Sequence, residues 1–197
     1  LLSIVDDSDP LNIKVGNPGL KPAFTNRLRL FYNTYIQSHQ RSIMTYLNYS
    51  NTRNSISNKV TYDEITGGRT TQPENINGNW DVNAAVMFNT SVDSAGVWNI
   101  NTFTTGGYNH YVSFLSLDKK SDSQKNVTRS MNIGERLSGS YRNSWLEFEL
   151  DGSLNYTHSR NALQASSDMD TWQFSYGTNI NLTLPWGTSV STDLHEN

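Results

Sequence analysis

The chain has 197 residues, with 15 lysines and arginines against 18 aspartates and glutamates, so its formal net charge is −3. This length allows one domain of ordinary size or part of a larger one, and the charge balance argues against a nucleic-acid partner. The absence of cysteine excludes disulfides, thiolate zinc sites and thiol catalysis, and no run of 18 apolar residues offers a transmembrane helix. Aromatic residues reach 11% although charged residues make up only 17%, which indicates β structure with one wet face rather than disorder.

The first part of the chain is polar and holds three of the five prolines, all before residue 23. We therefore predict that residues 1–24 form a loop that leads into the first strand. That strand is expected over 27–35, where Leu28, Leu30 and Tyr32 alternate with more polar positions. A second, long strand is predicted over 41–57, although Met44 and Tyr46 blur its alternation.

The later strands alternate more clearly. In the window 80–88 apolar residues occupy the even positions, and the windows 146–156 and 172–184 repeat this pattern. Such strict alternation is typical of strands with one apolar and one polar face. Weaker patterns predict further strands over 98–114, 127–141 and 188–194, which brings the expected total to about eight, with no helix.

The links between these strands alternate in length. Short links are expected over 36–40, 91–97, 142–144 and 185–187, and longer polar links over 63–72, 116–126 and 161–170. A membrane barrel explains this asymmetry, because its turns are short on the periplasmic side and its loops are long outside. The predicted strands are also longer than the five or six residues that are usual in soluble sheets.

Aromatic residues lie near the ends of the predicted strands, as in the two interfacial girdles of a membrane barrel. They are Trp80, Trp98, Tyr141, Trp145, Tyr156, Trp172 and Trp186. The same residues could also be strand formers in the core of a soluble sandwich. Taken with strand length and link asymmetry, they predict an all-β fold: an antiparallel up-and-down meander of about eight long strands over 25–197, forming a segment of a transmembrane β-barrel.

The alternation assigns residues to two faces. We predict a lipid-facing apolar band of Val82, Val86, Leu146, Phe148, Leu150, Leu154, Phe174, Ile180 and Leu182. We predict lumen-facing charges at Arg27, Arg29, Asp81, Arg136, Glu147, Glu149 and Asp151. Glu135 falls on the apolar parity, where a carboxylate facing lipid is costly, so either a bulge or a shift of the strand toward the interface is expected there.

No constellation of residues indicates catalysis, a cofactor or a metal. Glu147, Glu149 and Asp151 project from one strand face about 7 Å apart, which an acid–base pair could use, but an acidic stripe in a wet lumen explains them more simply. The acidic stretch at residues 6–9 matches no EF-hand loop, and the four histidines are scattered over different segments. We therefore expect no enzyme activity, no cofactor and no metal site.

Several short motifs carry a family resemblance. They are SDPLNI at 8–13, GNPGLKP at 16–22, KVTY at 59–62, GGRTTQP at 67–73, NINGNW at 75–80, GERL at 134–137 and SLNY at 153–156. Together they resemble the barrel domain of the TonB-dependent-receptor-like outer-membrane proteins of the Bacteroidetes. Each motif is loose, but the set spans nearly the whole chain.

The resemblance implies a location and a function. It implies part of an outer-membrane receptor or transporter barrel that takes up a nutrient, with outer-membrane lipid, the remaining barrel, a plug and the inner-membrane TonB complex as partners. We expect the plug and the energy-coupling box to lie outside this sequence, and residues 1–197 to have no activity of their own. A complete small eight-stranded barrel and a surface-exposed glycan-binding sandwich are the alternatives.

Overall fold

The computed structural model describes residues 4–117 and 120–196. Within these ranges the chain forms β-strands and two short 3-10 helices, and no α-helix. None of the described helices is long and apolar enough to cross a membrane.

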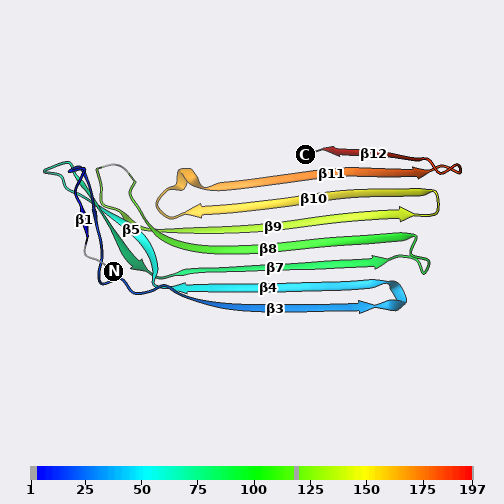
Figure 1. The fold of residues 1–197 in the computed structure, drawn as a ribbon, viewed down its shortest axis with the longest axis horizontal. Coiled ribbons are helices and arrows are strands. Elements are labelled where there is room, and N and C mark those ends of the chain that lie inside the picture. The colour runs from blue at the N-terminus through cyan, green and yellow to red at the C-terminus, as the bar shows by residue number, and fades with distance from the viewer. Residues whose placement is uncertain (1–3, 118–119, 197) are drawn as a thin grey trace.

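Eight long strands form a single antiparallel sheet (Figure 1). They are β3 (Phe24–Ile36), β4 (Arg41–Arg53), β7 (Asn79–Ser91), β8 (Trp98–Leu115), β9 (Gln124–Arg142), β10 (Leu146–Asn161), β11 (Met169–Thr183) and β12 (Ser189–Glu196). Their order in the sheet is β12-β11-β10-β9-β8-β7-β4-β3, so each long strand pairs with the next long strand along the chain. The predicted fold class, an up-and-down meander of about eight long strands, is confirmed.

The two ends of the sheet differ as the link lengths predict. Short links join the strands at one end of the sheet, which we call the short-link rim (Figure 1). One of these links, between β3 and β4, contains the 3-10 helix η1 (Gln37–His39). The longer connections gather at the opposite end, the long-link rim, and include η2 (Ala165–Ser167) between β10 and β11.

A second, smaller sheet stands at the long-link rim, where sequence patterns predicted loops. Its strands are β1 (Val5–Asp6), β2 (Asn12–Val15), β5 (Ser55–Tyr62) and β6 (Arg69–Ile76), in the order β1-β2-β6-β5. Strands β2 and β6 pair in parallel, with Ile13 opposite Thr70. Residues 1–24 are therefore not simply a loop, because part of this segment completes a sheet with the hairpin between β4 and β7.

The predicted strand over 41–57 divides at Asn54. This residue has φ 53, and asparagine adopts this left-handed conformation more readily than most residues because its short side chain can hydrogen-bond locally. The Asn54 N–H donates to Asn77 Oδ1 at 2.7 Å, and Asn75 Nδ2 donates to the Asn54 carbonyl at 2.8 Å. The chain thus leaves the long sheet after Arg53 and returns to it at Asn79.

The small sheet is hydrogen-bonded to the ends of β8 and β9. The Val60 N–H donates to Ser123 Oγ at 2.8 Å, and the Ser123 N–H donates back to the Val60 carbonyl at 2.7 Å. The Phe114 N–H donates to Ser57 Oγ at 3.1 Å. These polar contacts fix the small sheet to the longest hairpin of the molecule.

The long sheet has little core of its own. Among the described residues the buried apolar side chains are Ile76, Ala85 and Val112, whereas many large apolar side chains are exposed. A β-sandwich would bury those side chains between two packed sheets. The single layer therefore favours a barrel wall over the sandwich alternative.

Candidate functional site: two faces of the long sheet

One face of the long sheet is a continuous apolar surface. Cross-strand pairing places Phe148 opposite Ile180 and Leu154 opposite Phe174, because directly opposed residues of antiparallel strands share a face. All residues of the predicted apolar band lie on this face: Val82, Val86, Leu146, Phe148, Leu150, Leu154, Phe174, Ile180 and Leu182. Several are highly exposed, with Leu150 at 56% and Phe174 at 65%.

Aromatic pairs border this apolar face at both ends. Toward the long-link rim Tyr156 stacks on Trp172 with ring centroids 4.4 Å apart, and Trp80 stacks on Tyr108 at 5.1 Å. Toward the short-link rim Trp98 and Tyr141 lie 4.7 Å apart on neighbouring strands. The arrangement matches the aromatic girdles of outer-membrane barrels.

The opposite face is polar and carries every charged residue predicted for the lumen, in two separate groups. Near the short-link half Arg136 lies 3.8 Å from Asp151, and Arg142 forms an ion pair with Glu147. Glu149 stands on the same face, opposite Ser140 and Asn179. Glu147, Glu149 and Asp151 therefore share the polar face, and arginines of the neighbouring strand β9 neutralise part of this acidic stripe.

The second group lies on the strands at the β3 edge. Arg27 and Arg29 line one depression of about 510 Å³ together with Asp81. Asn48, Ser50 and Asn83 complete its polar lining. The strand register separates this group from the acidic stripe. Following the paired residues from β3 across the sheet to β10 leads from Arg29 to Thr157, which lies six residues along β10 from Asp151. Arg27 and Arg29 therefore stand apart from that stripe along the strands of the described sheet.

Comparison with known families agrees with this geometry. The model of the outer membrane protein beta-barrel family matches residues 1–125, which is more than half of the chain. The chain belongs to this family. Its location is accordingly the bacterial outer membrane. Searches of the curated proteins and of the solved structures gave no match.

Glu135 is the one predicted anomaly of this outer-membrane barrel wall, and the structure places it without a bulge. The pairing runs without interruption through β9, with Glu135 opposite Leu154 on one side and Thr104 on the other. Its carboxylate therefore belongs to the apolar face, between the two aromatic girdles. The bulge that would have turned it away is not present in β9.

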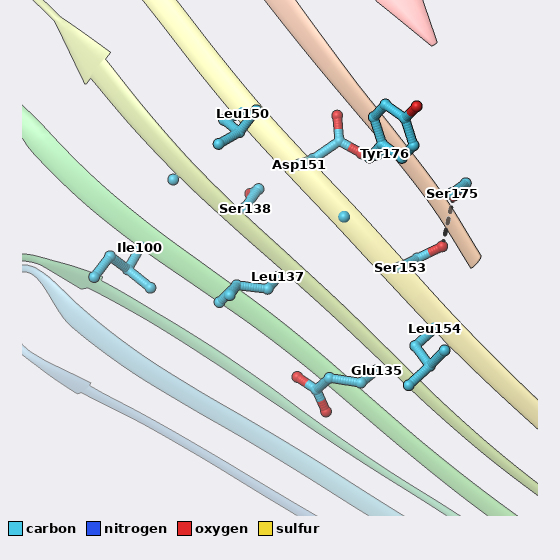
Figure 2. A pocket seen from close by; sticks show the side chains of 12 residues that line it. Ile100, Glu135, Leu137, Ser138, Leu150, Asp151, Ser153, Leu154, Ser175 and Tyr176 are labelled. Carbon is cyan, nitrogen blue, oxygen red and sulfur yellow. Dashed lines mark hydrogen bonds between the residues drawn. The ribbon is translucent and has the colours of Figure 1, made fainter. Parts of the chain in front are cut away.

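Beside Glu135 the apolar face is hollowed. The hollow has a volume of about 690 Å³, and Figure 2 shows Leu137, Leu150 and Leu154 around it with Glu135 among them. Its depth comes from glycines: a Cβ at Gly139 would meet no atom within 4 Å, and one at Gly152 would only approach the Ser175 carbonyl oxygen at 3.8 Å. The leucine side chains therefore surround a hollow whose bottom is formed in part by the backbone of these glycines.

A polar cluster that sequence reasoning missed lies where β10 and β11 approach the long-link rim. Asp170 accepts hydrogen bonds from Tyr156 Oη at 3.0 Å and from Arg160 at 2.7 Å, and lies 2.6 Å from His158 Nδ1. His158 and Asp170 are directly opposed across the two strands. Only the register brings them together, so scattered histidines gave no signal in the sequence.

The acidic stretch near the start of the chain uses its carboxylates in turns. Asp6 Oδ1 accepts from the Ser8 hydroxyl at 2.7 Å, and Asp9 accepts from the Leu11 N–H at 3.0 Å. The Ser8 hydrogen bonds lower the pKa of the Asp6 carboxyl, and those from Asn12 and Leu11 lower the pKa of Asp9. Within the described residues, no group of three His, Asp or Glu side chains is arranged to hold a metal ion.

Proposed function

We propose that this chain forms part of the wall of a TonB-dependent receptor that takes up a nutrient across the outer membrane. In this proposal the apolar face contacts lipid and the polar face lines a water-filled lumen. The observation that carries it is that the predicted apolar band lies on one face and all the predicted lumen charges lie on the other.

The separation supports this orientation on energetic grounds. Soluble monomers rarely expose a contiguous apolar patch larger than a few hundred Å², and here the apolar residues continue across neighbouring strands. Arginines and carboxylates on the other face need water, which a lumen supplies. The motifs that resemble the TonB-dependent receptors of the Bacteroidetes favour an energy-coupled transporter over a passive pore.

The edges of the long sheet support a larger barrel. In the described residues β3 and β12 form the two edges and do not pair with each other. Unpaired backbone N–H and C=O groups cannot remain exposed in hydrocarbon. We therefore propose that further strands complete the wall, together with a plug and the TonB complex as working partners.

Refolding separates this proposal from the small-barrel alternative. Residues 1–197 refolded alone in detergent should aggregate or unfold without cooperativity, because both edges lack partners. Gel-shift heat-modifiability and a thermal unfolding curve measure this. A monodisperse, cooperatively folded monomer would instead support a closed eight-stranded barrel.

Growth on limiting nutrients tests the transport itself. A strain lacking this protein is compared with its parent on single carbon, iron and cofactor sources, and the comparison is repeated without the TonB complex. We expect at least one nutrient whose uptake requires both. If the purified protein lets solutes cross liposome membranes freely and no nutrient depends on the TonB complex, the protein is a passive pore and the proposal is wrong.

A further inference from the structure

The polar face carries four arginines whose surroundings differ. Arg136 and Arg142, on β9, are each paired with a carboxylate of β10. Arg27 and Arg29, on β3, have no carboxylate within ion-pair distance among the described residues. Within the described strands, the two arginines of β9 are thus neutralised, whereas the two guanidinium groups on the edge strand β3 stand side by side without a carboxylate partner.

The two exposed arginines stand in a polar depression. They project from alternate positions of one strand, about 7 Å apart, and their neighbours across β4 and β7 are Asn48, Ser50, Asn83 and Asp81. Asp81 accepts a hydrogen bond from Asn83 Nδ2 at 3.2 Å. Two guanidinium groups against one carboxylate leave a local charge of +1 that can bind an anionic group. Guanidinium groups bind carboxylates and phosphates through paired N–H donors.

Aromatic rings adjoin these arginines on the same face. Phe31 is the residue of β3 that follows Arg29 on the polar face, and it pairs with Tyr46 of β4. Tyr46 pairs on its other side with the small Ala85 of β7. The Phe31 side chain is 68% exposed and Tyr46 is 36% exposed. Met44 and Met87 pair in the next row of the same face, so these two exposed rings begin an apolar part of the face that adjoins the two guanidinium groups.

We propose that Arg27 and Arg29, with Phe31 and Tyr46, form a lumen site for an anionic solute that carries a flat ring. The carboxylate or phosphate of the solute pairs with the guanidinium groups, its ring packs on Phe31 and Tyr46, and the amides of Asn48 and Asn83 orient its polar edge. This inference rests on the proposed function, because a solute reaches this face only if the face lines a lumen. It adds the chemical class of the solute that the barrel binds.

Binding of a matched pair of probes tests the site. Nicotinate and nicotinamide share a ring and differ in charge, and both are soluble enough for calorimetric titration of the purified full-length protein in detergent. We expect nicotinate to bind about tenfold more tightly than nicotinamide, since hydrogen bonds to charged groups are roughly twice as strong as neutral ones. Arg27→Gln and Arg29→Gln should each remove most of that preference.

Two further variants separate the ring contact from the charge contact. Phe31→Ala should weaken nicotinate and nicotinamide alike, because both lose the same ring packing. Arg142→Gln, on the same face but paired with Glu147, should leave both affinities unchanged, and heat-modifiability confirms that each variant is folded. Equal binding of the two probes, or equal losses in Arg29→Gln and Arg142→Gln, would overturn the proposal. Because these titrations involve no transport, their outcome is independent of the nutrient-uptake experiment.

Discussion

The two sheets of this protein have similarly polar sequences but differ in strand length and in the contacts that hold them. The long sheet has strands of up to 19 residues, strict alternation and an apolar face that no second layer covers. The small sheet has strands of two to eight residues and is joined to the long sheet by hydrogen bonds such as that between Val60 and Ser123.

The difference shows where each sheet obtains its stability. In the proposed orientation the long sheet depends on the contact of its apolar face with lipid, so a charge on that face should be its most damaging change. The small sheet depends on backbone geometry and polar contacts at the long-link rim, so single hydrogen bonds matter more there. Four sets of substitutions, in order of decreasing effect, test this contrast.

The largest effect is expected for a charge on the apolar face. Phe148→Arg or Ile180→Arg should lower the free energy of unfolding in lipid by about 2–4 kcal/mol, the cost of arginine near the bilayer midplane. Ser153→Arg and Asn179→Arg, on the polar face of the same strands, should cost much less. Chemical denaturation of the full-length protein in vesicles measures both sets, and equal costs on both faces would refute the assignment of the faces.

The next effect concerns the junction between the sheets. Gly78 has φ +116, and a Cβ there would approach Val112 Cγ2 to 2.9 Å. Gly78→Ala should cost about 1–3 kcal/mol of unfolding free energy, because it combines a strained backbone with this contact. Gly67→Ala is the control, since Gly67 also has a positive φ but its added Cβ would meet nothing within 4 Å. Thermal unfolding should rank Gly78→Ala as the more damaging change.

A smaller, local effect is expected from the attachment of the small sheet. Ser123→Ala removes the acceptor of the Val60 N–H and should cost about 1 kcal/mol. Hydrogen exchange should become faster at Val60, and proteases should cut the β5–β6 hairpin more readily. The unfolding midpoint of the long sheet should stay unchanged. A parallel fall in that midpoint would show that the two sheets unfold as one unit.

The smallest effect is expected in the link between β7 and β8. The Asp93 carboxylate accepts from the Trp98 N–H at 2.7 Å and from the Ala95 N–H at 3.1 Å, and the Trp98 hydrogen bond lowers its pKa below the ordinary value of 3.8. Its stabilising contribution is therefore complete above the unfolded pKa and is lost as the pH falls through the folded pKa. Wild type should unfold at a slightly higher temperature than Asp93→Asn at pH 7, and this difference should disappear once the pH is low enough to protonate the folded carboxyl, which requires a pH below 3.8. A difference that persists there would assign the effect to shape rather than charge.

The sequence predicts the long sheet well because its signal is local. Alternation in a window such as 146–156 reports which residues face the same way, and the structure pairs Phe148 with Ile180 on the apolar face as expected. The two charged groups of the polar face were also placed on the correct parity. Their separation was not predictable, because it depends on the register between strands far apart in the sequence.

The small sheet was not predicted because its decisive contacts are non-local. The parallel pair joins Ile13 to Thr70, and no periodicity within either segment indicates the other. Part of a signal was present, since Ile56, Val60 and Tyr62 share a parity that is typical of a strand. The end of β4 just before Asn54 could not be predicted, because an asparagine in the left-handed conformation does not interrupt the alternation of apolar and polar residues in the sequence around it.

The length of the β8–β9 hairpin determines what an approaching molecule meets. Strand β9 has 19 residues and extends about 60 Å, whereas the apolar band of such a barrel is about 25 Å tall. In the proposed orientation the hairpin extends beyond this apolar band even when it is tilted, and it holds the small sheet away from the lipid. With the long links outward, an antibody or a phage tail fibre reaching the cell would touch the small sheet long before the wall. The small sheet, and not the wall, would then be the part of this chain that such a molecule contacts first.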